Sequence, residues 1–221
     1  MRRNEMIERL VELITACPVA HPLRVAIDGV DASGKTTLAD ELAAPLVARG
    51  RPVIRASIDG FHRPRAERYQ RGPDSPEGYY HDAFAYPALR EHLLRPLGPG
   101  GSRRYRRAVF DVRADRALPV NEEGAPEDAI LLLDGVFLLR PELDDLWDYR
   151  VFVDVPFEVT LARATRRDLA LFGSTEAVVA RYERRYIPGQ RLYLREARPL
   201  ERADVVVENA DPEDARLVLR E

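Results

Sequence analysis

Residues 29–36 read Gly29-Val30-Asp31-Ala32-Ser33-Gly34-Lys35-Thr36 and decide the fold. The stretch matches G-x-x-x-x-G-K-[ST] at every defined position. The apolar run 23–28 before it predicts a buried strand, and residues 35–49 after it predict a helix that Gly50 closes. A glycine-rich loop between a strand and a helix N-terminus presents backbone N–H groups to an anion, and the helix dipole adds about half a positive charge. The sequence therefore predicts a site for the phosphates of a nucleotide.

Two side chains of this loop have predicted tasks. Lys35 is expected to neutralise the β- and γ-phosphates of ATP, and the Thr36 hydroxyl to ligate Mg²⁺. Lys35 is also the only lysine among 34 lysines and arginines, so its place in this loop calls for a functional reason. The residues predicted to bind ATP are Gly29, Asp31, Ala32, Ser33, Gly34, Lys35, Thr36 and Thr37.

Apolar runs and helical patterns alternate along the rest of the chain. Buried strands are predicted at 52–58, 129–133, 149–153 and 203–207, and helices at 82–94, 157–171 and 174–186, with a break at 188–189. Residues 60–80 are polar and predict a long loop, and 104–120 alternate enough to predict a hairpin. We therefore expect an α/β protein: a P-loop NTPase three-layer sandwich with a parallel central sheet and small hairpin and lid insertions.

Composition is that of an ordinary globular protein. The 221 residues carry a net charge of −3, with 45% hydrophobic and 32% charged residues, which gives no reason to expect a nucleic-acid partner. One cysteine, Cys17, excludes a disulfide within the chain. Apolar residues at helical spacing predict an amphipathic helix within residues 1–20, where acidic residues argue against a signal peptide. We expect a cytoplasmic protein without a membrane segment, forming one domain over 1–221, and a homo-oligomer remains open.

Aspartates follow three of the predicted strands. Ligands bind beyond the carboxyl ends of strands in an open parallel sheet, where Asp59, Asp134 and Asp154 are expected. Asp134, after four large aliphatic residues and before Gly135, favours a role at the metal. Asp59 opens the arginine-rich loop 60–80 and favours a general base. For Asp154 a helix cap is the preferred interpretation.

Arginines gather in the segment 160–190, which we predict to be a lid. Arg163, Arg166 and Arg167 share one helix, and a charged helix end beside a glycine bend can bring arginine onto transferring phosphate. A solvated helix face explains them equally well. Arg181, Arg184 and Arg185 are assigned to solvent, with substrate contact as the lesser alternative. The arginines around Tyr105 are assigned to a solvated hairpin rather than to nucleic-acid binding.

Several segments in order resemble the uridine kinase family, in the P-loop group that includes phosphoribulokinases and type I pantothenate kinases. The resemblance covers nearly the whole chain, from Leu23 to Asn209. Besides the P-loop, it rests on Asp59-Gly60-Phe61-His62, Asp82-Ala83-Phe84, Ala108-Val109-Phe110-Asp111, Leu132-Leu133-Asp134-Gly135, Phe152-Val153-Asp154, Arg167-Asp168 and Ala203-Asp204-Val205-Val206. It implies ATP- and Mg²⁺-dependent transfer of a phosphoryl group to a primary hydroxyl, most readily the 5′-hydroxyl of uridine or cytidine.

The resemblance also implies roles for single residues. Asp59 would take the hydroxyl proton, Asp134 would serve the magnesium ion, and Arg167 would contact phosphate together with Lys35. The substrate-binding residues implied are Asp59, His62, Asp82 and Arg163. Within 60–120, the acceptor side, two positions depart from the family: His62 replaces a tyrosine, and no histidine lies near residues 114–115. A sugar or pantothenate-like acceptor is therefore the first alternative, and a nucleotide-dependent switch with a protein partner the second.

Overall fold

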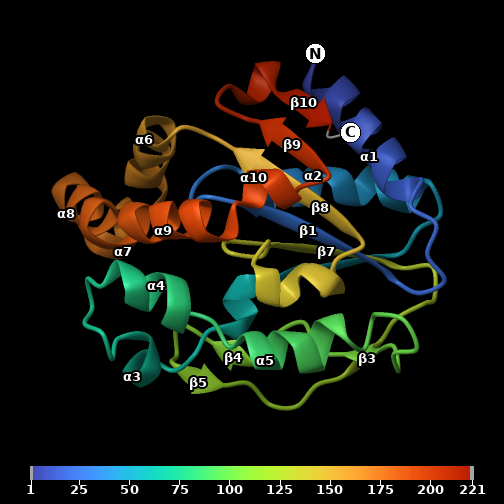
Figure 1. The fold of residues 1–221 in the computed structure, drawn as a ribbon, viewed down its shortest axis with the longest axis horizontal. Coiled ribbons are helices and arrows are strands. Elements are labelled where there is room, and N and C mark those ends of the chain that lie inside the picture. Colours follow the sequence, from blue (N-terminus) through green and yellow to red (C-terminus); the bar gives the residue numbers. More distant parts are fainter. Residues whose placement is uncertain (1, 220–221) are drawn as a thin grey trace.

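A six-stranded sheet forms the centre of the protein in this computed structural model, which describes residues 2–219 (Figure 1). The strand order is β10-β9-β8-β1-β7-β2. The five parallel strands are β1 (Leu23–Gly29), β2 (Val53–Ser57), β7 (Ile130–Gly135), β8 (Tyr149–Asp154) and β9 (Val205–Glu208), and β10 (Arg216–Leu219) closes one edge antiparallel. The predicted parallel α/β sheet is confirmed, and only β10 was not expected.

Alternating residues of each strand pack into two separate cores, one on each face of the sheet. On one face Val25, Ile27 and Leu132 join α1 (Arg3–Thr15) and α2 (Lys35–Ala48). On the other face Ala26 and Leu133 pack with residues of α4 (Pro76–Asp82) and α9 (Ile187–Ala197). Burial on both faces explains why the strands are apolar throughout rather than alternating.

The amphipathic helix expected near the N-terminus is α1. Its buried face consists of Met6, Ile7, Leu10, Val11 and Ile14. Among residues 2–219, no helix combines the length and the apolar character that crossing a bilayer requires.

Residues 60–80 contain two helices, so the long loop predicted there is wrong. α3 (Arg65–Arg68) and α4 interrupt it, and α4 begins where the Ser75 hydroxyl accepts the Gly78 N–H at 3.0 Å, with Pro76 in the first turn. The helix predicted at 82–94 starts later, as α5 (Tyr86–Leu89) and the π-helical turn Arg90–Leu94. Both errors arise because elements this short have little periodicity.

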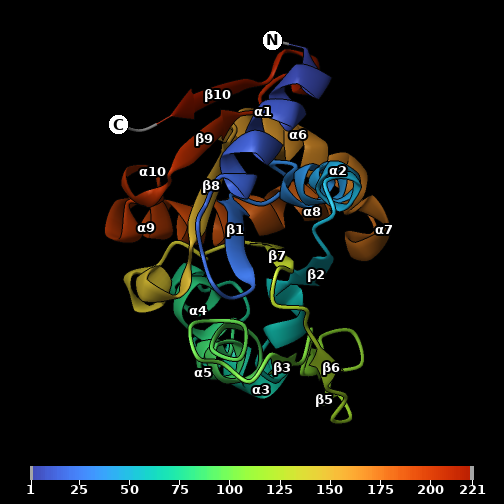
Figure 2. The same ribbon diagram turned by 90° about the vertical axis from the view of Figure 1, so that its right-hand side faces the viewer.

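Around the acceptor-side helices lie two small ribbons rather than one hairpin. β3 (Arg104–Tyr105) pairs with β6 (Glu123–Gly124), and β4 (Phe110–Asp111) pairs with β5 (Arg116–Ala117). These strands lie with α3, α4 and α5 at the end of the molecule opposite α1 (Figure 2).

The break predicted at residues 188–189 is also wrong. α8 (Thr175–Arg181), the π-helical turn Tyr182–Tyr186 and α9 follow one another directly. Pro188 lies in the first turn of α9, where its missing N–H costs little. A Cβ on Gly189 would lie 2.8 Å from Cδ1 of Tyr79, so the glycine permits α9 to pack closely on α4.

The remaining helices and turns lie between these elements. The helix predicted at 157–171 is divided into α6 (Phe157–Arg167) and α7 (Leu169–Phe172). α10 (Pro199–Arg202) precedes β9, and 3₁₀ turns cover Ile58–Phe61, Pro141–Leu146 and Pro212–Asp214. α6 starts at Phe157 with Pro156 at its cap, so the helix cap predicted for Asp154 is wrong.

Candidate active site

The loop Gly29–Gly34 passes close to the ends of β8 and β9. Gly34 has φ = +99°, and a Cβ there would lie 2.7 Å from Nδ2 of Asn209. At Gly29 a Cβ would lie 2.5 Å from the carbonyl oxygen of Val153. Glycine is required at both positions because any side chain would push the loop away from the sheet. The motif glycines thus form a cradle shaped by the backbone.

Lys35 directs its ammonium group back into this loop. Nζ donates a hydrogen bond to the carbonyl of Val30 at 2.7 Å, and the residue is 8% exposed. Burial lowers the pKa of Lys35, while the nearby carboxylates of Asp31 and Asp28 oppose that shift. A buried ammonium group beside a nest of N–H groups is suited to bind phosphate oxygens.

Thr36 and Asp134 bring two oxygen donors together. The Thr36 hydroxyl donates to Oδ2 of Asp134 at 2.6 Å, and Asp134 Oδ1 accepts a hydrogen bond from Arg55 at 3.0 Å. β7 lies between β1 and β2, which places Asp134 beside the loop. Within residues 2–219 no three His, Cys, Asp or Glu side chains are arranged to hold a metal. Magnesium commonly needs only one or two protein oxygens plus substrate phosphates, so this donor pair fits that ion.

Asp59 lies in the 3₁₀ turn after β2 and is open to solvent. Its side chain is 72% exposed, and Nδ1 of His62 lies 3.9 Å from its Oδ1. His62 Nδ1 donates to the backbone carbonyl of Asp59 at 3.0 Å, and its ring packs 4.5 Å from the ring of Phe84. Burial lowers the pKa of His62, so the imidazole is neutral at pH 7. Asp59 is therefore a solvent-exposed carboxylate beside a neutral ring.

Asp31 connects the loop to the acceptor side. Its Oδ2 accepts hydrogen bonds from the Tyr79 hydroxyl and from Nε2 of Gln190, both at 2.7 Å. Burial raises the pKa of Asp31, and the charge of Lys35 lowers it. The structure thus directs this side chain, predicted to bind ATP, towards α4 and α9. Sequence reasoning missed Tyr79 and Gln190, which no motif marks.

Arg167 and Arg163 both come from α6 but have different partners. Arg167 donates to both oxygens of Asp168, at 2.7 and 3.0 Å, and to the Tyr182 hydroxyl at 3.0 Å. Arg163 donates to the carbonyls of Ser33, Asn209 and Ala210. Arg163 therefore connects the loop to the segment that follows β9.

The other arginines lie apart from the loop. Arg181 donates to the Pro73 carbonyl and to Asp74, each at 2.7 Å, and Arg185 donates to the Pro73 and Ser75 carbonyls. These hydrogen bonds connect α8 and the π-helical turn Tyr182–Tyr186 to residues 73–75. Asp82, predicted to bind substrate, pairs with Arg71 at 2.8 Å. The hairpin arginines pair with acidic neighbours, Arg104 with Glu122 and Arg107 with Glu123.

A buried carboxylate that sequence reasoning did not single out lies beneath the loop. Asp28, at the end of β1, accepts hydrogen bonds from the Tyr193 hydroxyl, from the Leu139 N–H at 2.9 Å and from the Gly29 N–H at 2.6 Å. Burial raises its pKa to about 6 although these hydrogen bonds lower it. Through its hydrogen bond with the Gly29 N–H, the buried Asp28 carboxylate fixes the first residue of the loop.

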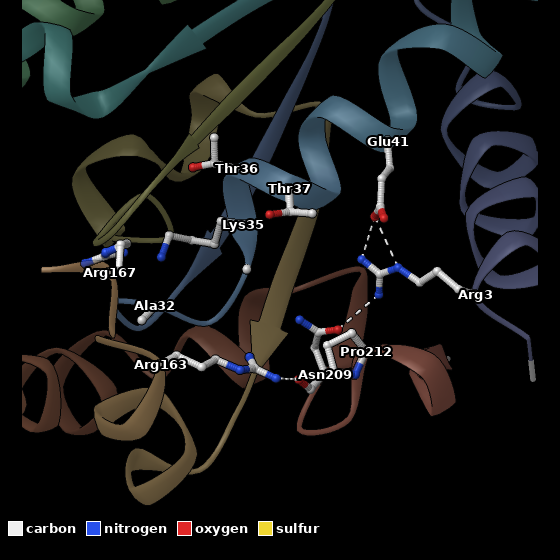
Figure 3. Close-up of a pocket in the computed structure, with 11 residues that line it drawn as sticks. Arg3, Ala32, Lys35, Thr36, Thr37, Glu41, Arg163, Arg167, Asn209 and Pro212 are labelled. Atoms are coloured by element: carbon white, nitrogen blue, oxygen red, sulfur yellow. Dashed lines mark hydrogen bonds and ion pairs between the residues drawn. The ribbon is translucent and has the colours of Figure 1, made fainter. Parts of the chain in front are cut away.

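A cavity of about 500 Å³ opens beside the loop (Figure 3). Its walls come from α1, the loop, α2, α6 and the segment after β9. The lining residues are Arg3, Ala32, Gly34, Lys35, Thr36, Thr37, Glu41, Arg163, Arg167, Asn209 and Pro212. The volume is that of a small-molecule site.

The parallel sheet, the glycine cradle, the buried lysine and the threonine–aspartate pair define a P-loop kinase. Residues 25–215 match the Phosphoribulokinase / Uridine kinase family, and the chain belongs to that family.

Individual relatives agree with this placement. Uridine-cytidine kinase B of Dictyostelium discoideum is 28% identical over 85% of this chain and 74% of its own length. A protein of Bacillus stearothermophilus provisionally named a uridine kinase has TM-score 0.72 and 26% identity over 92% of this chain and 97% of its own. A protein of Silicibacter sp. TM1040 provisionally named a fructose transport system kinase has a TM-score of 0.69 and 27% identity over 92% of this chain and 95% of its own.

Proposed function

We propose that the protein transfers the γ-phosphoryl group of ATP to a primary hydroxyl of a small molecule, most readily the 5′-hydroxyl of a pyrimidine nucleoside. The observation that carries the proposal is the arrangement at neighbouring strand ends. A phosphate loop with its lysine, the Thr36–Asp134 pair and the exposed Asp59 follow β1, β7 and β2, which are adjacent in the sheet.

Lys35 and the loop N–H groups hold the phosphates and stabilise the negative charge that spreads over the transferred group. Arg167, which already contacts Asp168 and Tyr182, is the arginine positioned at the same end of the cavity. Most of the catalysis in such reactions is positioning and electrostatics.

Thr36 and Asp134 are the residues that would hold Mg²⁺. Bound there with the phosphates, the ion would neutralise part of their charge. Asp134 is 4% exposed and already engaged by Thr36 and Arg55, which suits a fixed metal-side group.

Asp59 takes the proton of the attacking hydroxyl. Its solvent-exposed carboxylate, free of an arginine partner in residues 2–219, contrasts with the engaged Asp134 and favours it as the base. His62 lies beside Asp59 and is a further polar group for the acceptor, while Asp31 and Tyr79 are hydrogen-bonded to each other at 2.7 Å. We assign Arg163 to the ATP-binding part of the site rather than to the acceptor, because its partners are carbonyls of the loop and of the segment after β9.

A second candidate is a kinase for a sugar or another non-nucleoside alcohol. Asp82, which the resemblance assigns to the acceptor, pairs with Arg71, and the hairpin lacks the expected histidine. Similarity to the Silicibacter protein points the same way.

The test measures ATP consumption with Mg²⁺ in the presence of uridine, cytidine, other nucleosides, pantothenate and simple sugars. Stimulation by uridine or cytidine with the 5′-monophosphate as product supports the first candidate. Stimulation only by a non-nucleoside supports the second. Slow ATP hydrolysis that no alcohol increases would contradict both.

A further inference from the structure

The cavity beside the P-loop has two chemically different ends (Figure 3). Lys35 and Arg167 lie at one end and supply positive charge for phosphates. Arg3 and Glu41 lie at the other end, where their charges offset each other. A nucleotide held by its phosphates at Lys35 must extend its ribose and base away from them. The second end is therefore where the nucleoside belongs.

Arg3 is held firmly at this second end. Its Nε and Nη2 donate to Oε2 of Glu41 at 3.1 and 2.6 Å, and its Nη1 donates to Oδ1 of Asn209 at 3.0 Å. The Arg3 side chain is 14% exposed. α1, from which Arg3 projects, is anchored by its buried apolar face. Arg3 is thus part of a rigid wall rather than a loose terminal residue.

α1 lies before residue 25, where the family match begins. A segment outside the matched region therefore contributes a side chain, that of Arg3, to the predicted nucleotide site. Five apolar residues already attach α1 to the core, so the three hydrogen bonds of Arg3 are not needed merely to hold the helix in place.

Glu41 keeps one oxygen available. Oε2 accepts both hydrogen bonds from Arg3, and Oε1 has no hydrogen-bond partner among residues 2–219. A free carboxylate oxygen repels phosphate but accepts hydrogen bonds from ribose hydroxyls and base amino groups. The guanidinium group of Arg3 is planar and can stack on an aromatic ring.

We propose that Arg3 and Glu41 bind the nucleoside part of the nucleotide donor, with Glu41 Oε1 accepting a hydrogen bond from a hydroxyl or amino group and Arg3 lying against the base. The inference rests on the proposed function only in requiring a nucleotide donor. It does not depend on the acceptor.

The test compares dissociation constants for ATP and for inorganic tripolyphosphate, both with Mg²⁺, by isothermal titration calorimetry on the full chain. Arg3→Ala and Glu41→Gln are expected to weaken ATP binding about five- to thirty-fold and to leave tripolyphosphate binding unchanged. Arg9→Ala is the matched control, because Arg9 lies on α1, is half exposed and, among residues 2–219, has an ion pair with Glu12 alone. Arg9→Ala should change neither constant.

Two results would overturn the inference. A structural role alone would disturb the loop through Asn209, whose Nδ2 donates to the Ser33 carbonyl at 2.7 Å, and would weaken both ligands equally. Unchanged ATP binding in both variants would show that the nucleoside lies elsewhere. Glu41→Gln keeps an oxygen for Arg3 and serves as the decisive variant if Arg3→Ala lowers the melting temperature. Wild-type protein that binds neither ligand would contradict the proposed function instead.

Discussion

The donor side and the acceptor side of the site are built differently. On the donor side, the phosphate loop is one continuous segment from β1 to α2, and its lysine is fixed in place and buried. The acceptor side consists of helices of four to seven residues and strands of two residues, with an exposed Asp59 and several surface ion pairs. The difference indicates that phosphate chemistry is fixed rigidly, whereas acceptor choice depends on parts that can vary.

Lys35→Met removes the only lysine and should produce the largest effect. The variant loses the charge that faces the phosphates, so kcat should fall by about 10³- to 10⁵-fold. Steady-state ATP consumption with the acceptor that gives the fastest turnover measures kcat, and circular dichroism checks that the variant is folded. Retention of more than a tenth of wild-type kcat would show that the donor side does not work through this ammonium group.

Asp59→Asn tests the acceptor side at the proposed base. The amide cannot take the hydroxyl proton, so kcat should fall by about 10²- to 10⁴-fold, while the dissociation constant for ATP stays within twofold. On the same preparation, steady-state kinetics measures kcat and isothermal titration calorimetry measures the dissociation constant for ATP. An unchanged kcat removes Asp59 from the mechanism, and a parallel loss of ATP binding would mean that the two sides are not separable.

Tyr193→Phe probes the buried support of the donor side. The variant removes a hydrogen bond to the Asp28 carboxylate and should lower the free energy of unfolding at pH 7.5 by roughly 1–3 kcal/mol. The pKa of Asp28 is raised to about 6, so its ionisation already opposes folding above that pH, and Tyr193 offsets part of the cost. The loss should therefore shrink below pH 6, where Asp28 is protonated. Urea unfolding at pH 5 and 7.5 measures it.

A loss from Tyr193→Phe that is equal at both pH values would indicate a packing defect rather than a charged hydrogen bond. Tyr149→Phe is the control, since the hydroxyl of that buried tyrosine has no side-chain hydrogen bond within residues 2–219.

His62→Ala should have the smallest effect and only on the acceptor side. Loss of the ring beside Asp59 and Phe84 should raise KM for the acceptor about three- to tenfold, with the KM for ATP unchanged. Burial lowers the pKa of His62, so the wild-type ring stays neutral at pH 7, and acidification below about pH 6.5 should destabilise wild type slightly more than the variant. A change in the KM for ATP would contradict this separation of the two sides.

The sequence alone predicted the phosphate loop, because each part of that loop is local. The spacing of Gly29, Gly34 and Lys35 between an apolar strand and a helix fixes the phosphate cradle, and the alternating apolar runs fix the parallel sheet. Asp134 and Asp59 followed from the rule that strand ends meet at one edge.

Only the tertiary structure decided how distant segments meet. Nothing near Asp31 in the chain indicates Tyr79 and Gln190 as its partners, because α4 and α9 reach it only through packing. Helices as short as α3 and α4 lack a readable period, and Pro188 and Gly189 looked like a break although their contacts make them part of α9. Arg3 is the clearest case: an ordinary residue of an amphipathic helix in the sequence, it lines the cavity beside the loop because α1 packs beside α2.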